Sequence, residues 1–314
     1  MATVASGAGL RLFEIPADTD GPAIRVAEWS PCAQPAEQIE IGPFTLPAVR
    51  NCPIMGSRLP LIVLSHGYGG SYLGHHDTAE TLANAGFIVV ALNHPDDTAT
   101  NREKRRSLMA LRSRPTDVHR LLDFMLERSP DAAPIDARRI GFFGFSRGGY
   151  TGLVLAGAIP DFRRLRLPCA EPGGGACPPV PSMVSVPADG LRRDPRIQAF
   201  VIADPLASVF PTAESVSAVT APVQLWGSES GSPDGALPED VATVARHLPA
   251  TAERHMVAGA GHFAFLTLCP PVLAKAEPDL CSDGPNFDRA AFHEDFNTRV
   301  VAFFRTHLPD AASP

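Results

Sequence analysis

One pentapeptide constrains this chain more than any other feature. Residues Gly144-Phe145-Ser146-Arg147-Gly148 read G-x-S-x-G, between the apolar run Arg139–Phe143 and the glycine-rich, apolar stretch Gly149–Ala156. The first flank predicts a buried strand and the second a helix packed closely against a neighbour. A serine at such a turn adopts a strained backbone conformation, which small neighbours permit. The pattern therefore predicts that the Ser146 hydroxyl stands at the end of a strand as a nucleophile, rather than in an incidental glycine-rich turn.

The size and composition of the chain exclude several classes of protein. It has 314 residues, of which 45% are hydrophobic and 19% charged, enough for a large core. The net charge of −7 disfavours a nucleic-acid partner. The longest apolar runs, such as Phe87–Leu92, are too short to cross a bilayer. We expect one domain over residues 1–314.

Short apolar runs alternate with amphipathic stretches along most of the chain, which predicts an α/β fold with a mostly parallel sheet covered by helices on both faces. Three regions lack clear periodicity: a proline-rich stretch at 31–58, an insertion at 160–195 and a cysteine-bearing loop at 263–286. The expected strands are 10–15, 24–29, 59–64, 87–92, 139–143, 197–203, 221–227 and 253–257, and the expected helices are 77–85 (capped by Asp77), 116–128, 149–156, 238–248 and 287–308.

A serine hydroxyl needs a neighbouring base, and the base needs an acid that orients it and stabilises its charged form. In this chemistry on a parallel sheet, the expected chain order is serine, acid, histidine. Of the histidines after Ser146, only His262 lies in a loop beyond the last predicted strand, and Gly259-Ala260-Gly261 lets that loop bend over the sheet. The others fall on predicted helices or inside a strand: His247, His255, His293 and His307.

Three acidic residues are candidates for the third member. Asp204 directly follows the strand 197–203, next along the chain from the serine turn. Glu229 and Asp234 follow the later strand 221–227, which lacks an aspartate at the usual distance. We favour Asp204, whose alternative role is to cap the turn at Pro205.

Attack on a carbonyl places negative charge on oxygen, so two backbone N–H groups must already point at it. We expect one from Arg147, directly after the serine, and one from Tyr68 in Ser65-His66-Gly67-Tyr68-Gly69-Gly70. His66 is expected to support this loop. The run His75-His76-Asp77 hints at a metal site, but exposed residues before a helix explain it better. No cofactor or metal is expected.

Six cysteines lie in three near-neighbour pairs, all in loop stretches rich in proline and glycine: Cys32 and Cys52, Cys169 and Cys177, and Cys269 and Cys281. An even count in such loops predicts disulfides and an oxidising compartment, against the alternative of six free thiols. The first ten residues lack the basic start and long apolar run of a signal peptide. The cysteines nevertheless favour a secreted or periplasmic location.

The chain resembles the α/β-hydrolase superfamily over nearly its whole length. Its motifs at 65–70, 144–149 and 259–263 resemble those of bacterial predicted dienelactone hydrolases, and the chain is similar to platelet-activating-factor acetylhydrolases. In the acetylhydrolases the acid follows the strand after the serine turn, which supports Asp204. True dienelactone hydrolases use a cysteine where this chain has Ser146, so their substrate does not carry over. Polyester hydrolases and cutinases share the first two motifs but place the acid at the later turn.

The resemblance and the residues together predict a serine carboxylic-ester hydrolase. Its substrate is expected to be a small-molecule or polymeric ester. An amidase, a thioesterase with the same three residues, or a non-catalytic domain of the same fold remain alternatives. A non-catalytic domain would be expected to have lost the serine, the histidine or the glycines, all of which are present.

Overall fold

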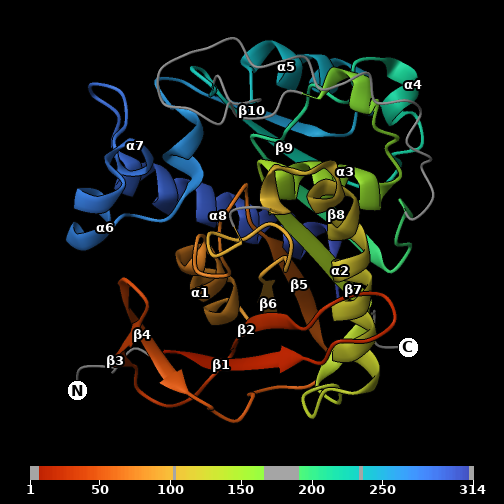
Figure 1. Ribbon diagram of the computed structural model, residues 1–314. Coiled ribbons are helices and arrows are strands. Elements are labelled where there is room, and N and C mark those ends of the chain that lie inside the picture. The colour runs from red at the N-terminus through yellow and green to blue at the C-terminus, as the bar shows by residue number, and fades with distance from the viewer. Residues whose placement is uncertain (1–6, 102–103, 166–190, 233–235, 311–314) are drawn as a thin grey trace.

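A ten-stranded sheet organises the part of the chain that the computed structural model describes, residues 7–101, 104–165, 191–232 and 236–310 (Figure 1). The strands are β1 (Ala8–Ile15), β2 (Ile24–Ser30), β3 (Glu37–Ile41), β4 (Phe44–Arg50), β5 (Leu59–Ser65), β6 (Ile88–Leu92), β7 (Ile135–Phe145), β8 (Ile197–Ala203), β9 (Val223–Ser228) and β10 (Glu253–Val257). Their spatial order is β10-β9-β8-β7-β5-β6-β2-β1-β4-β3. The strands from β10 to β6 are all parallel, and β2 joins β6 antiparallel. The predicted, mostly parallel sheet is confirmed.

Helices cover both faces of this sheet. The cluster on one face includes side chains of α2 (Leu108–Glu127), α3 (Arg147–Ala156) and α5 (Pro238–His247). The cluster on the other includes α1 (His76–Asn84) and α8 (Arg289–His307). The remaining helical segments are short: α4 (Ala213–Val216), α6 (Pro271–Ala276), α7 (Pro278–Cys281) and the 3-10 turns η1 (Lys104–Arg106), η2 (Phe162–Arg164) and η3 (His262–Phe265).

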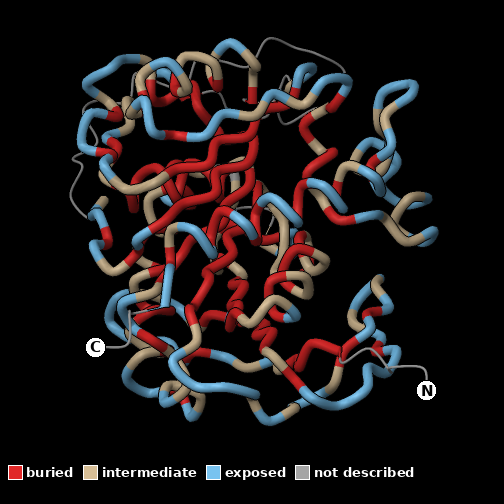
Figure 2. The backbone as a smooth tube through the Cα atoms, turned by 180° about the vertical axis from the view of Figure 1, so that it is seen from behind, coloured by how far each residue is buried: buried red, intermediate tan, exposed pale blue. Residues whose placement is uncertain are grey.

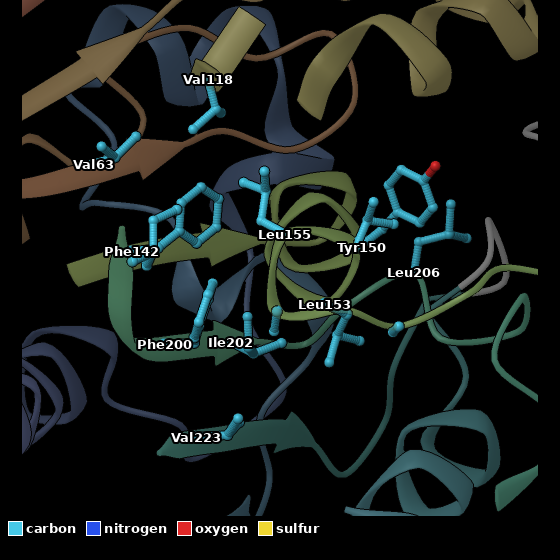
Figure 3. Packing of buried hydrophobic residues seen from close by; sticks show 14 of the residues in the cluster. Val63, Val118, Phe142, Tyr150, Leu153, Leu155, Phe200, Ile202, Leu206 and Val223 are labelled. Atoms are coloured by element: carbon cyan, nitrogen blue, oxygen red, sulfur yellow. The ribbon is translucent and has the colours of Figure 1, made fainter. Parts of the chain in front are cut away.

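Alternation along the central strand divides the core into two layers. Phe142 of β7 faces α3, where it packs near Leu155 and Phe200 (Figure 3). Phe143, the next residue, faces α8 and contacts Phe296 edge to face. Most residues of the central strands are buried, including all of 140–145 in β7, and they form the red tube in the middle of Figure 2. The two layers hold β7 rigidly, and β7 ends at the serine turn.

The structure corrects the expectation for the proline-rich stretch 31–58. Residues 37–50 form a hairpin, β3 and β4, joined by a turn at Gly42 and Pro43. Gly42 has φ 58°, a conformation that glycine adopts at no steric cost. Alternating apolar residues, with Ile39 and Leu46 buried, give the hairpin one inward face. Proline density concealed this alternation.

Other expectations need smaller corrections. Asp77 was expected to cap α1 but does not. Helix α1 begins at His76, and the Asp77 carboxylate instead accepts hydrogen bonds from His293 and Asn297 of α8. The loop 263–286 contains η3, α6 and α7, and α2 begins at Leu108. Most of the insertion predicted at 160–195 lies outside the described residues.

Two of the three predicted disulfides are present. Cys32 bonds Cys52, and Cys269 bonds Cys281. Cys169 and Cys177 lie outside the described residues. Within the described ranges, no helix is both long enough and apolar enough to cross a membrane.

Candidate active site

Ser146 occupies a strained turn between β7 and α3. Its φ of 55° and ψ of −115° fall where L-residues are rarely found, a position that serine holds only when its surroundings impose it. Its amide donates to the carbonyl of Ala203 (2.9 Å), and its carbonyl accepts from Tyr150 and Leu206 (3.0 Å each). These bonds tie the turn to β8 and to the first turn of α3. The predicted turn geometry is therefore present.

Two glycines of the motif are required by close backbone contacts. A Cβ on Gly144 would lie 2.2 Å from the carbonyl oxygen of Gly148. A Cβ on Gly148 would lie 1.9 Å from the carbonyl oxygen of Ser65. Both distances are far shorter than any real carbon contact, so no side chain fits at either position. Helix α3 can approach β5 and β7 this closely only because these positions are glycine.

The structure brings together Ser146, His262 and Asp204. The Ser146 Oγ lies 3.0 Å from His262 Nε2, and His262 Nδ1 lies 2.6 Å from Asp204 Oδ2. The His262 ring also packs against the ring of Phe145 in a tilted arrangement, with centroids 4.6 Å apart. Ser146 is partly exposed, whereas Asp204 is fully buried. The order of contacts is the one that an activated serine nucleophile requires.

The backbone conformation of Asp204 and the hydrogen bonds of its carboxylate fix the orientation of its side chain. Its backbone has φ 40°, so Asp204, like Ser146, is a non-glycine residue with a positive φ. One carboxylate oxygen accepts the amide of Ser228 (2.9 Å), and the other accepts the Ser228 hydroxyl (2.7 Å) and faces His262. These bonds compensate a buried charge and orient it towards the ring.

The alternative acids lie elsewhere. The Glu229 carboxylate accepts the amide of Gly259 at 2.7 Å, so it supports the backbone of the loop that leads to His262. Asp234 lies outside the described residues. The distances thus favour Asp204 as the partner of His262.

The loop after β5 lies beside the serine, with Tyr68 at its tip. Arg147 begins α3, where a helix amide has no partner inside the helix. Its buried side chain lies over the Tyr68 ring at 4.3 Å and donates to Asp97 Oδ2 at 3.0 Å. Asp97 also accepts the amide of Gly69 at 3.1 Å. The guanidinium of Arg147 thereby joins the two segments expected to supply the N–H groups.

Both ring nitrogens of His66 form hydrogen bonds with backbone groups in or beside this loop. Its Nδ1 lies 2.7 Å from the Gly67 carbonyl, and its Nε2 accepts the amide of His94 at 3.1 Å. Burial, with Arg114 nearby, holds the pKa of His66 well below its usual range, so the ring is neutral. A neutral ring that donates from Nδ1 and accepts at Nε2 satisfies both contacts.

The run His75-His76-Asp77 ties α1 to the His262 turn and to α8. His75 Nδ1 contacts the carbonyl of Phe265, and Asp77 contacts His293 Nδ1 at 2.6 Å. His293 in turn contacts the carbonyl of Ala264 at 2.9 Å. Among the described residues, no group of three or more potential metal-ligating side chains occurs. The contacts explain these residues as anchors of η3.

A cavity of about 180 Å³ opens above Ser146 and His262. The loop 66–71 lines it, and its walls are largely apolar. The wall residues come from four separate segments: Tyr68, Leu206, Phe263, Leu266 and Leu280.

Sequence reasoning missed Ser228 and Asp97. Ser228 ends β9 beside Asp204, and its hydroxyl has no motif of its own. Asp97 follows β6 and is fully buried, where it also accepts Arg114 at 2.7 Å. The one sequence signal for Asp97 was its position after the end of a parallel strand, where residues of a binding or active site are commonly found.

Comparisons with known proteins agree with this architecture. A family model described as platelet-activating factor acetylhydrolase, isoform II, matches residues 21–113, which include the loop at 65–70. The predicted resemblance is confirmed over that stretch, which ends before Ser146. A search of curated protein sequences found no match.

Solved structures match over nearly the whole chain. A ferulic acid esterase from Streptomyces cinnamoneus is 19% identical, with a TM-score of 0.67, covering 100% of this chain and 93% of that one. A dienelactone hydrolase from Anabaena variabilis is 16% identical, with a TM-score of 0.54, covering 95% and 99%. The chain has the α/β-hydrolase fold.

Proposed function

We propose that this protein is a serine hydrolase of carboxylic esters. The observation that carries the proposal is the hydrogen-bonded series Ser146–His262–Asp204, which begins at a strained, partly exposed serine and opens on an apolar cavity. The ester chemistry in the names of the matching family and structures supports the same reaction class.

In the proposed reaction, His262 Nε2 takes the proton of Ser146 as its Oγ attacks the ester carbon. Asp204 holds the ring with Nδ1 as the donor and stabilises its positive charge. The amides of Tyr68 and Arg147 stabilise the negative oxygen of the tetrahedral intermediate. His262 then gives its proton to the leaving alcohol. Water, activated by the same ring, hydrolyses the acyl-enzyme and restores Ser146.

The chemical test is hydrolysis of p-nitrophenyl esters from acetate to laurate, with wild type beside Ser146→Ala. We expect release of p-nitrophenol by the wild type and none above background by the variant. A fluorophosphonate probe should label Ser146 in the folded protein, identified by peptide mass spectrometry. A folded wild type that neither hydrolyses an ester nor takes the label is a non-catalytic domain, which refutes the proposal.

Amides and thioesters use the same machinery, so matched acyl substrates separate these activities. We expect the oxygen ester of a given acyl group to be cleaved faster than its anilide at equal concentration. Preferential cleavage of the anilide or thioester would reassign the substrate class while keeping Ser146, His262 and Asp204 in their roles.

The disulfides bear on where the protein acts. Disulfides such as Cys32–Cys52 and Cys269–Cys281 are typical of oxidising compartments, so we propose a secreted or periplasmic location. Mass spectrometry of protein from its native source, alkylated without reduction, tests this. Alkylated cysteines at these four positions would contradict it.

A further inference from the structure

One wall of the cavity comes from an outlying part of the chain. Residues 267–283, which we call the α6–α7 arm, leave the body after η3 and stand beside it (Figure 1). Most of the arm is exposed, and Val272 of α6 is 62% exposed. Leu280 of α7 is half-buried and lines the cavity with Ser146 and His262. An arm with no place in the core thus contributes a side chain to the site.

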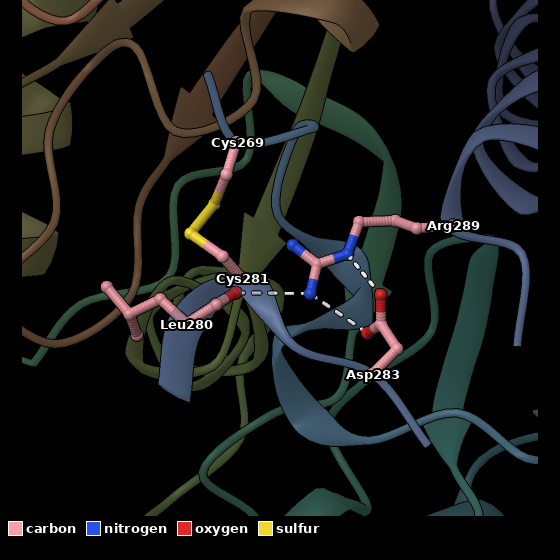
Figure 4. The surroundings of a disulfide bond; sticks show 5 residues. All are labelled: Cys269, Leu280, Cys281, Asp283 and Arg289. Atoms are coloured by element: carbon pink, nitrogen blue, oxygen red, sulfur yellow. Dashed lines mark hydrogen bonds and ion pairs between the residues drawn. A yellow bond between two sulfur atoms is a disulfide. The ribbon is translucent and has the colours of Figure 1, made fainter. Parts of the chain in front are cut away.

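Two contacts hold this side chain in position, as Figure 4 shows. Cys281, next to Leu280, is bonded to Cys269 at the other end of the arm. Arg289, at the start of α8, donates to both oxygens of Asp283 at 2.7 and 2.9 Å. The same guanidinium donates to the carbonyl of Leu280 at 3.1 Å. The Leu280 side chain points away from this ion pair (Figure 4).

Arg289 is only 6% exposed, so its ion pair with Asp283 is shielded from water. A buried, two-point contact between a guanidinium and a carboxylate fixes geometry as well as adding energy. Arg289 belongs to the rigid α8, whereas Asp283 and Leu280 belong to the arm. The ion pair therefore anchors the segment that carries Leu280 to α8.

The reaction identifies which part of an ester meets Leu280. His262 gives its proton to the leaving oxygen, so the alcohol group must lie beside the imidazole ring. Phe263 and Leu266 are near neighbours of His262 in the chain, and α7, which carries Leu280, contacts η3, which begins at His262. We therefore expect the alcohol group to meet these cavity-lining side chains. The cavity of about 180 Å³ is small. For scale, an engineered apolar cavity of about 150 Å³ in another protein admits benzene.

We propose that Leu280 limits the length of the alcohol group that the site accepts, and that Arg289 and the Cys269–Cys281 disulfide are positioning groups that keep it there. This rests on the proposed ester hydrolysis. The enzyme then prefers esters of short alcohols, and its selectivity is set by a side chain 134 positions from the nucleophile in the sequence.

The test compares kcat/KM in a pH-stat for butanoate esters of ethanol, butanol, hexanol and octanol, and for ethyl esters of acetate to octanoate. In Leu280→Ala, we expect the hexyl-to-ethyl ratio in the alcohol series to rise at least about tenfold, the usual lower value for one methylene in an apolar pocket. The acyl series should keep its wild-type profile. Leu280→Phe should shift the alcohol profile towards shorter groups.

Matched variants separate positioning from general damage. Arg289→Gln loses the two-point contact, and we expect it to shift the alcohol profile in the same direction as Leu280→Ala. The double variant Leu280→Ala/Arg289→Gln should shift it no further than Leu280→Ala alone. Arg299→Gln, which breaks the exposed pair with Asp295 on the same helix, and Val272→Ala on the arm should leave the profile unchanged.

The disulfide is tested with the same series. Cys269→Ala/Cys281→Ala should shift the alcohol profile as Arg289→Gln does and lower the melting temperature. The melting temperature falls because the variant lacks the covalent link that restricts the unfolded chain.

The outcomes are separable. An unchanged alcohol profile in Leu280→Ala and Leu280→Phe, or a change confined to the acyl series, overturns the role of Leu280 while ester hydrolysis stands. A wild type without any ester hydrolysis refutes the proposed function itself. Unaltered selectivity in both Arg289→Gln and the cysteine variant refutes the positioning roles alone.

Discussion

Two hydrogen-bonded series among the described residues have the same three residue types in the same order, but one borders the cavity of about 180 Å³ and the other is buried. In each, a serine hydroxyl meets a histidine Nε2 whose Nδ1 meets an aspartate. The members are Ser146, His262 and Asp204 in one (3.0 and 2.6 Å) and Ser65, His94 and Asp117 in the other (2.9 Å each). Residue types and distances alone do not distinguish an active site.

Access and backbone conformation distinguish them. Ser65 ends β5 as a fully buried residue, and its hydroxyl also contacts Arg114 Nη2 at 3.1 Å. His94 is likewise sealed from solvent. Ser146 instead occupies the strained turn at the start of α3, partly exposed beside Tyr68 and Arg147. A serine becomes a useful nucleophile only where substrate and oxyanion donors can reach it.

The protonation states of His94 and Asp117 also differ from those that a catalytic histidine and its acid would need. Burial, with Arg114 nearby, holds the pKa of His94 well below its usual range. Burial raises the pKa of Asp117 to about 8. At neutral pH His94 and Asp117 are therefore both uncharged, and their role is to satisfy each other's hydrogen-bonding groups in the core.

The two series are nevertheless linked through residues that adjoin them. The carbonyl of Ser65 is the atom that would collide with a side chain at Gly148, and Arg114 donates to the carbonyl of His66. The buried series thus supports the loop and the turn on which the exposed one depends. Four experiments test this division of roles, in order of decreasing effect.

Removing each serine gives the largest contrast. We expect Ser146→Ala to lower kcat/KM at least about 10⁴-fold, because the nucleophile is lost. Ser65→Ala should keep activity within about tenfold while losing about 1–3 kcal/mol of stability, since it leaves buried partners unsatisfied. Ester hydrolysis and urea unfolding of both variants measure this. A larger activity loss in Ser65→Ala than in Ser146→Ala would reverse the assignment.

The acid is the next contrast. Asp204→Asn should lower kcat about 10³–10⁴-fold because asparagine favours the wrong tautomer of His262. Glu229→Gln should keep most of the activity, since it affects only the contact with Gly259. If Glu229→Gln is the inactive variant instead, the acid lies at the later turn.

A methyl group at the contact between the two series tests their coupling. Gly148→Ala places a Cβ 1.9 Å from the Ser65 carbonyl, so α3 or β5 must move. We expect a loss of about 3 kcal/mol or more in the free energy of unfolding. Gly86→Ala is the control for the loss of a glycine, because nothing lies within 4 Å of its added carbon, although its positive φ adds a strain of its own. Equal losses in both variants would argue against the contact.

The smallest effect concerns pH. Below pH 4 the Asp117 carboxyl is protonated in the folded and unfolded chain alike, and stability from this group is complete. As pH rises towards 8, the unfolded chain releases the proton that the folded protein retains, so this contribution falls. Asp117→Asn removes this pH dependence. Between pH 5 and 8 we expect the free energy of unfolding to decrease in both proteins, and the decrease in the variant to be smaller than that in the wild type by at least about 1 kcal/mol.

Urea unfolding at each pH gives this difference. Asp295→Asn, an exposed carboxylate on α8, is the control and should follow the wild-type curve. An Asp117→Asn curve parallel to wild type would show that the buried aspartate is ionised throughout.

Features that depend on neighbouring residues were predictable. The turn around Ser146 follows from adjacent glycines and apolar flanks, and both described disulfides join cysteines at most 20 positions apart. The hairpin at 37–50 is a local element that was missed because prolines masked its alternation. Asp77 resembled a cap, yet it pairs with His293 more than 200 positions away.

The sequence alone determined the class of fold, the strained serine and the order serine, acid, histidine, since each depends on local periodicity, glycine or chain direction. Only the tertiary structure placed Asp204, and not Glu229, beside His262, brought Leu280 to the cavity, and showed which serine faces a pocket and which is buried. These outcomes depend on distances between segments far apart in the chain, which packing of the two layers around β7 sets. A hydroxyl, an imidazole and a carboxylate are the same groups in both series, and what separates the two series is burial together with the backbone conformation at the serine.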